Sequence, residues 1–174
     1  MIIEKRKETE GEEIIRLFLE DEGIEFKQEA EIPNLRGDFA DLRTADFYLL
    51  QYKVYVEFFG QWNAGDKHRE RYKSKKEVYK NNNVPCVYLY PENLGILKFV
   101  FKRRLKAELT KHPELKWQLL KLNWTLFWEK FGLIGIAFGF LVYYIPNLYL
   151  KGGLLLLLIA HIYSSIKDSF LRKA

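Results

Sequence analysis

The first helix that the pattern of apolar and polar positions predicts covers residues 8–22. Glu12, Ile15 and Leu19 follow the i, i+3, i+7 spacing of one helical face, and Gly23 comes next as a typical helix-ending residue. The Glu12 carboxylate is therefore expected to point toward a sheet rather than toward water. The alternative is that Glu12 caps the helix or pairs with a nearby lysine.

Segments rich in aromatic and β-branched residues follow this helix and predict a sheet. The expected strands cover residues 24–32, 47–50, 52–59 and 84–90, and a strongly charged helix over 66–81 precedes the last of them. This order of helix, strands, helix and strand predicts an α/β fold with a small mixed sheet flanked by helices. Cys86 lies in the last apolar strand, so we expect it to be a small core residue.

The last third of the chain has a different pattern, because two uncharged segments follow one another. Residues 131–150 carry no charge, and residues 152–166 are uncharged again after Lys151. A helix that crosses a bilayer needs about 20 apolar residues. We therefore expect a two-helix transmembrane hairpin over 124–170, with a basic tail at 171–174. A helical hairpin buried in a soluble protein and a shallow re-entrant hairpin are the alternatives.

A basic segment, residues 96–123, joins the front domain to these uncharged segments. Phe101, Leu105 and Leu109 form an apolar stripe between basic residues, and His112-Pro113 predicts a break between two helices. Basic amphipathic helices beside a membrane segment suit an anionic lipid surface. The same charges also suit the phosphates of a nucleic acid.

The distribution of charge supports a chain in two parts. The chain has 174 residues, with 28 Lys and Arg against 23 Asp and Glu, which gives a net charge of +5. Residues 1–93 hold 15 basic and 19 acidic side chains, whereas residues 94–174 hold 13 basic and 4 acidic ones. Basic residues flank the uncharged segments, and only Lys151 lies between them. The positive-inside rule then predicts a membrane protein whose front domain and C-terminus are cytoplasmic.

Three acidic residues of the front domain lie where a negative charge is costly. Glu57 is inside the apolar strand V-Y-V-E-F-F-G, Asp46 opens the preceding strand, and Glu12 faces the sheet. Carboxylates that converge in a poorly solvated place repel one another, and a hard divalent cation such as Mg²⁺ relieves this repulsion. The alternative for Asp46 is an ordinary turn residue.

The order of these motifs resembles the PD-(D/E)xK nuclease superfamily, in its small restriction-endonuclease-like domains, over residues 5–95. Glu12 in T-E-G-E-E-I-I corresponds to the family's helix glutamate, Asp46 in R-T-A-D-F to its metal-binding aspartate, and Glu57 to its second acidic ligand. Ala45 stands where proline is usual. The resemblance implies that Asp46 and Glu57 bind Mg²⁺ or Mn²⁺, with the backbone carbonyl of Phe58 as a further ligand.

The lysine of the family's motif falls two residues after the strand acid, where this chain has Phe59. In some relatives the lysine lies on the following helix, and Lys75, four residues before Tyr79, matches that position. Gln61 is a second candidate, which would orient a water molecule. The other cations of the helix are expected to contact phosphates or to form a solvated face: Lys67, Arg69, Arg71, Lys73 and Lys76.

The resemblance thus implies a nuclease domain over residues 1–95 that hydrolyses phosphodiester bonds of DNA or RNA with Mg²⁺ or Mn²⁺, and the uncharged segments predict that it is anchored to the membrane. DNA is the expected nucleic acid. Gly135 and Gly139 allow close helix packing, within the hairpin or between copies of the chain. One alternative is a catalytically degenerate module that binds nucleic acid or a protein partner at the membrane. The other is a membrane scaffold that binds a protein partner through its front-domain aromatics Phe47, Tyr48, Phe58 and Phe59.

Overall fold

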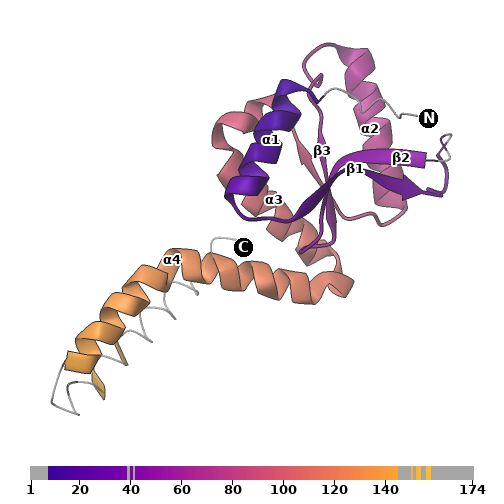
Figure 1. Ribbon diagram of the computed structural model, residues 1–174. Coiled ribbons are helices and arrows are strands. Elements are labelled where there is room, and N and C mark those ends of the chain that lie inside the picture. The colour runs from indigo at the N-terminus through magenta and orange to yellow at the C-terminus, as the bar shows by residue number, and fades with distance from the viewer. Residues whose placement is uncertain are drawn as a thin grey trace, which may run out of the picture. The chain divides into compact units, whose positions relative to one another are not determined.

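The computed structural model in Figure 1 describes residues 8–38, 40, 42–144, 150, 152–153 and 156–157 of the chain. The chain divides into two compact units, Met1–Asn123 and Trp124–Ala174. The strands and the candidate site lie in the first unit, which is therefore described first.

The first unit is built around a four-stranded sheet with the strand order β1-β2-β3-β4. Its strands are β1 (Phe26–Pro33), β2 (Leu42–Leu49), β3 (Val54–Phe58) and β4 (Cys86–Leu89). The β1–β2 and β2–β3 pairs are antiparallel, and the β3–β4 pair is parallel. Helix α2 (Asp66–Asn81) makes the crossover that a parallel pair requires. The predicted α/β fold with a mixed sheet is therefore confirmed.

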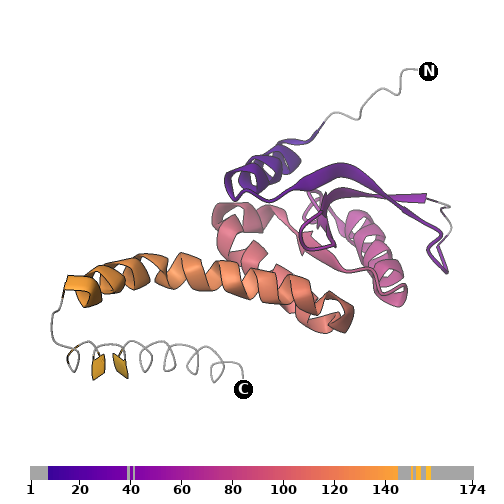
Figure 2. The same ribbon diagram turned by 60° about the horizontal axis from the view of Figure 1, so that its bottom comes forward.

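Helices cover both faces of this sheet, as Figures 1 and 2 show. Helix α2 lies on one face, and helices α1 (Glu10–Asp21) and α3 (Leu97–Lys111) lie on the other. Ile15 and Leu19 of α1 are fully buried, as their spacing predicts. The ring of Phe18 meets that of Phe101 of α3 edge-on, with 5.2 Å between centroids. The two helices and the sheet thus share one core.

The predicted elements differ from the observed ones mainly at the ends of strands. Helix α2 has the predicted bounds, and α1 ends just before Gly23, whose φ of +63° favours glycine. Strand β2 begins at Leu42 rather than at residue 47, because Leu42 pairs with Pro33 in the long ladder with β1. Cross-strand pairing therefore extends β2 through polar residues that the hydrophobic pattern does not mark.

The predicted helix break at His112-Pro113 is confirmed. Helix α3 ends at Lys111, a 3₁₀ turn covers Pro113–Leu115, and α4 runs over Lys116–Tyr144. The basic amphipathic segment was expected to suit an anionic lipid surface or nucleic acid phosphates, and the apolar stripe of α3 is buried in the first unit. Phe101 and Leu105 are fully buried there, and the helix packs against β4 and against the 3₁₀ segment Pro91–Ile96. The sequence pattern does not distinguish a helix that lies on a membrane surface from a helix that packs on a protein core, because each carries an apolar stripe.

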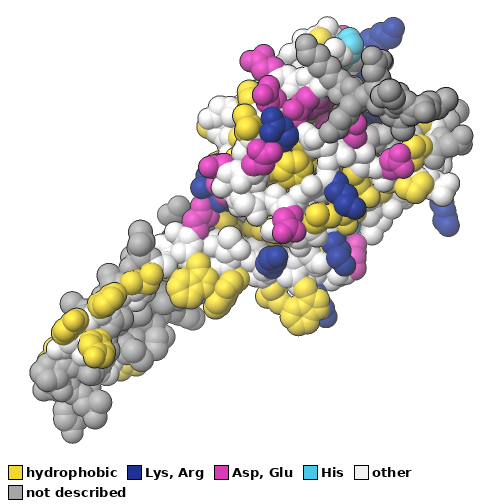
Figure 3. Space-filling view, in the orientation of Figure 1, with side chains coloured by type: hydrophobic (Ala, Val, Ile, Leu, Met, Phe, Trp, Pro, Cys, Tyr) yellow, Lys and Arg dark blue, Asp and Glu magenta, His cyan; other side chains and the backbone are white. Residues whose placement is uncertain are grey.

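Large hydrophobic side chains are exposed along α4, as Figure 3 shows. They are Trp117, Leu120, Trp124, Trp128, Ile136, Phe140, Tyr143 and Tyr144. None of the helices within the described residues is long and apolar enough to cross a membrane. Most of the predicted second hairpin helix, residues 152–166, and the basic tail at 171–174 lie outside the described residues.

Candidate active site

Glu57 lies inside β3 with only 2% of its surface exposed, and its carboxylate is held by two side chains of α2. The Nζ atom of Lys75 lies 2.6 Å from Oε1 and 2.7 Å from Oε2, and the Tyr79 hydroxyl donates to Oε1 at 2.8 Å. Lys75 and Tyr79 are four residues apart, so they project from one face of the helix. Helix α2 thereby supplies both partners of a buried strand carboxylate.

The electrostatics of this cluster follow from its burial. Burial raises the pKa of the Glu57 carboxyl, and the Lys75 ammonium opposes that shift. Burial and then the Glu57 charge raise the pKa of the Tyr79 phenol, so its hydroxyl stays protonated and donates. Lys75 also donates to the backbone carbonyl of Thr44 at 3.2 Å, so one ammonium bridges β2 and β3.

Asp46 lies where β2 leaves β3. The β2–β3 pairing covers Phe47–Leu49, and at Asp46 the side chain accepts a hydrogen bond from the Phe58 N–H at 2.6 Å. On the other side of β2, the ladder with β1 passes from Gln28–Phe47 to Ala30–Ala45, and Glu29 between them has a left-handed φ of +49°. Both ladders are therefore irregular at Asp46, where a carboxylate replaces a backbone acceptor.

The charge of Asp46 is coupled to the other two candidate carboxylates. Burial and then the charge of Glu57 raise the pKa of Asp46 to about 7, and the charge of Glu12 adds to this rise. The Phe58 N–H and the Lys75 ammonium act in the opposite direction. The structure thus brings Glu12, Asp46 and Glu57 into one electrostatic cluster, with Lys75 as its cation.

Glu12 caps its helix and also contributes to this cluster. The Thr9 N–H donates to Glu12 Oε2 at 2.8 Å and the Glu12 N–H donates to Thr9 Oγ1 at 3.4 Å, which is a capping box. Glu12 is only 8% exposed. Gly11 lets the first turn of α1 approach the ring of Phe58, because a Cβ atom at Gly11 would lie 2.2 Å from Cε1 of that ring. The capping role and the inward position that the sequence offered as alternatives therefore coexist.

Phe59, at the family's usual lysine position, belongs to an aromatic cluster. It is 1% exposed, its ring stacks on that of Tyr72 with 4.3 Å between centroids, and Trp62 lies beside it at 6.2 Å. The rings of Tyr88 and Tyr90 complete the cluster. This strand position therefore serves packing, and the ammonium that reaches Glu57 comes from α2.

The remaining sequence candidates occupy different places. Lys67, Arg71 and Lys73 are exposed on α2, and Arg69 pairs with Asp66 at 3.4 Å. Lys76 lies over the ring of Tyr88, 5.0 Å from its centroid, and lines a cavity beside β4 rather than the carboxylate cluster. Gln61 is exposed, and its backbone N–H donates to the Tyr72 hydroxyl at 3.3 Å.

The structure adds two residues that the sequence analysis did not select, Tyr79 and Arg43. The signal for Tyr79 was its i+4 spacing from Lys75. Arg43 makes two hydrogen bonds of 2.5 and 2.6 Å to Asp38, and its positive charge helps to lower the pKa of Glu57. Arg43 is the first residue of the R-T-A-D-F motif, but the predicted strand began after it, so the hydrophobic pattern gave no reason to place its side chain at the site.

The donor chemistry of the cluster suits a hard cation, since Asp46 and Glu57 offer carboxylate oxygens. The raised pKa of Asp46 marks a negative charge that burial leaves poorly solvated. Within the part of the chain that the structure describes, however, no group of three or more His, Cys, Asp and Glu side chains is arranged to hold a metal ion. Lys75 and Tyr79 occupy the Glu57 oxygens in this arrangement.

The site is thus a pair of carboxylates on two neighbouring strands, Glu57 buried and Asp46 half-buried, with a helix lysine as its cation. No family model, no curated protein and no solved structure matches the chain.

Proposed function

We propose that the chain is a metal-dependent nuclease whose first unit resembles the restriction-endonuclease-like domains of the PD-(D/E)xK superfamily. The observation that carries this proposal is the contact of Lys75 with Glu57 beside Asp46. A buried carboxylate, a half-buried one beside it and an ammonium are the groups that phosphodiester hydrolysis requires. Hydrolysis of DNA is the expected activity.

Each residue of the cluster has a defined role in this proposal. Asp46 and Glu57 would hold Mg²⁺ or Mn²⁺ beside the backbone of Phe58, and the bound ion would supply an activated water and charge screening. The Lys75 ammonium stabilises negative charge on the scissile phosphate. Glu12 orients a ligand from the start of α1. The exposed cations of α2 contact the nucleic acid backbone without reading its sequence.

Cleavage of a plasmid and of a fluorescent RNA with Mg²⁺ or Mn²⁺ tests this function. We expect Glu57→Gln, Asp46→Asn and Lys75→Met each to reduce cleavage by at least about a hundredfold. The matched controls are Glu31→Gln, Asp21→Asn and Lys53→Met, which alter exposed residues outside the cluster. Cleavage by the Glu57→Gln variant at the wild-type rate would exclude this site.

A second candidate function is a module that binds nucleic acid without cleaving it. The observation that favours it is that Lys75 and Tyr79 already occupy both oxygens of Glu57. A wild-type chain that binds DNA with every metal tested, and cleaves with none, would support this second function over the first. Binding of neither DNA nor RNA would argue against both.

We further propose that the second unit attaches the chain to a membrane as a helical hairpin, with the first unit and the C-terminus in the cytoplasm. The support is the uncharged sequence over 131–150, its basic flanks and the exposed apolar side chains of α4. Gly135 and Gly139 offer a surface for pairing with a second copy. Reporter fusions after residue 150 and after residue 174 should report opposite sides of the membrane. A reporter on the same side at both positions would contradict a double span.

A further inference from the structure

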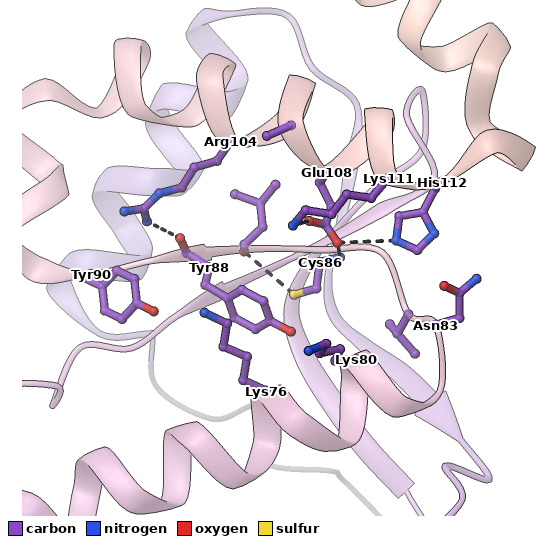
Figure 4. A pocket seen from close by; sticks show the side chains of 13 residues that line it. Lys76, Lys80, Asn83, Cys86, Tyr88, Tyr90, Arg104, Glu108, Lys111 and His112 are labelled. Carbon is purple, nitrogen blue, oxygen red and sulfur yellow. Dashed lines mark hydrogen bonds and ion pairs between the residues drawn. The ribbon is translucent and has the colours of Figure 1, made fainter. Parts of the chain in front are cut away.

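A cavity lies at the outer edge of β4, and its lining does not include Asp46, Glu57 or Lys75. Its volume is about 620 Å³, within the range of pockets that hold small ligands. Figure 4 shows α2 on one side of this cavity and α3 on the other, with β4 between them.

Cationic side chains enter this cavity from both helices. Lys76 and Lys80, one turn apart, extend from α2, and Arg104 and Lys111 extend from α3 on the opposite side (Figure 4). Lys76 and Lys80 form no ion pair within the described part of the chain. Both ammonium groups are therefore free to bind an anion.

The acidic residue of the lining, Glu108, is already paired. Its carboxylate lies 2.8 Å from Lys111 Nζ and 3.4 Å from His112 Nε2, and it accepts a hydrogen bond of 3.4 Å from the Cys86 N–H. Glu108 therefore compensates its neighbours on α3 and leaves the lysines of α2 without a counter-charge. The cavity therefore carries an excess of positive charge, which comes from Lys76 and Lys80.

Two aromatic rings lie beside these cations. Lys76 Nζ is 5.0 Å from the ring centroid of Tyr88, and the Arg104 guanidinium is 5.2 Å from that of Tyr90. Arg104 is held in place because it donates to the Tyr88 carbonyl and, at 2.8 Å, to Oδ1 of Asn93. Ammonium and guanidinium groups bind phosphate oxygens, and the two rings hold these cations at the wall of the cavity.

The edge of β4 is partly occupied by side chains of α3. Glu108 accepts from the Cys86 N–H and Arg104 donates to the Tyr88 carbonyl, so an added peptide strand would have to displace both contacts. The remaining features are a concave shape, unpaired lysines and aromatic rings, and these match a nucleotide.

We propose that this cavity binds the phosphate groups of a nucleotide, supplied as a free nucleotide or as part of a nucleic acid strand. Lys76 and Lys80 contact the phosphate oxygens. Arg104 lies on the opposite side of the cavity, where its hydrogen bonds to Tyr88 and Asn93 hold it in place. This site is separate from the carboxylate cluster, so it does not depend on the proposed nuclease activity.

Two probes test the proposal on the full chain in the presence of EDTA, which prevents cleavage. ATP is titrated by calorimetry, and a fluorescent single-stranded DNA of about ten nucleotides by anisotropy. We expect Lys76→Ala/Lys80→Ala to weaken binding by at least about tenfold and to lower the salt dependence of oligonucleotide binding. The control Lys27→Ala/Lys53→Ala removes the same charge from exposed positions elsewhere and should bind as the wild type does.

The outcomes separate the two sources and the two sites. Lysine-dependent binding of ATP identifies a free nucleotide, and lysine-dependent binding of the oligonucleotide alone identifies a strand; either result supports the cavity. If Glu57→Gln still binds ATP or the oligonucleotide, the cavity binds its ligand independently of the candidate active site. Equal binding by the two double variants, or no binding of either probe to the wild type, would overturn the proposal.

Discussion

Glu57 occupies a strand position between Val56 and Phe58, where an unpaired carboxylate would cost several kcal/mol. The three hydrogen bonds and ion contacts from Lys75 and Tyr79 offset that cost. Replacing one partner of such a buried pair is more damaging than its net contribution suggests, because the other charge remains buried. For this reason Lys75→Met is expected to lower stability as well as cleavage, and its stability must be measured beside its activity.

Asp46 gives a prediction at the same scale, on the pH dependence of stability. Its pKa is about 7 in the folded chain against an ordinary value of 3.8, so the folded chain retains a proton that the unfolded chain has lost between these pH values. The favourable contribution is complete below about pH 4 and is lost as pH rises through about 7. The wild type should therefore lose stability relative to Asp46→Asn over this window, as measured by urea unfolding at a series of pH values.

The control for this prediction is Asp21→Asn, since Asp21 is exposed at the end of α1. Its unfolding is measured over the same series of pH values, so that effects of pH on the rest of the chain appear in both variants. A constant difference in stability between Asp46→Asn and the wild type would contradict the raised pKa of Asp46, and the proposed cluster would lose its electrostatic basis.

At the scale of elements, α1 is positioned on the sheet by a contact between backbone and ring. Gly11 lies in the first turn of α1, and the ring of Phe58 occupies the space that a side chain would need. The same turn carries Glu12 and its capping box, so this contact also sets the distance from Glu12 to the cluster.

Gly11→Ala should therefore destabilise the chain, although alanine favours a helix. A methyl group 2.2 Å from Phe58 Cε1 forces the ring or the helix to move, at a cost of about 1–3 kcal/mol in the free energy of unfolding. Gly95→Ala is the control, because no atom lies within 4 Å of a Cβ there. Adding Phe58→Leu should restore part of the loss, and a strictly additive double variant would argue against the contact.

The lysine that contacts Glu57 illustrates how elements share a site. On β3 the position two residues after Glu57 is filled by Phe59, which packs with Tyr72 and Trp62. Because α2 crosses the same face of the sheet, its side chains reach the carboxylate that the strand presents. A helix can therefore supply the ammonium group to a site when the matching strand position is occupied by a buried aromatic residue.

At the scale of the whole molecule, the first unit extends to Asn123. Helix α3 contributes buried residues to it, including Val100, Phe101 and Leu105, and Leu122 of α4 is only 3% exposed. The helix is thus a part of the core rather than a connection to the second unit. Loss of four large apolar side chains from a core exceeds the stability of most small domains.

A chain truncated after Asn123 is therefore expected to unfold cooperatively, whereas one truncated after residue 95, the boundary that the sequence suggested, is expected to remain unfolded. Circular dichroism and urea titration distinguish the two. Cooperative unfolding of the shorter chain would show that α3 is dispensable for the core. As a control, Leu105→Ala in the longer chain should cost about 2–5 kcal/mol in the free energy of unfolding.

The sequence by itself determined the elements and the candidate charges. Helical spacing placed Glu12, Ile15 and Leu19 on one buried face, and an apolar strand around Glu57 marked a carboxylate that needs partners. Both are local patterns, set by the periods of helix and strand. The bounds of α2 followed for the same reason.

Only the tertiary structure decided which groups meet. The bond from Tyr79 to Glu57, the end of β2–β3 pairing at Asp46 and the burial of α3 on the sheet each join segments far apart in the chain. An amphipathic stripe predicts that one face of a helix will be covered, but it does not predict what covers that face. A lipid surface and a protein core offer the face the same apolar environment. The choice of Lys75 rather than Lys76 as the partner of Glu57 likewise depends on how α2 is rotated over the sheet, which follows from packing.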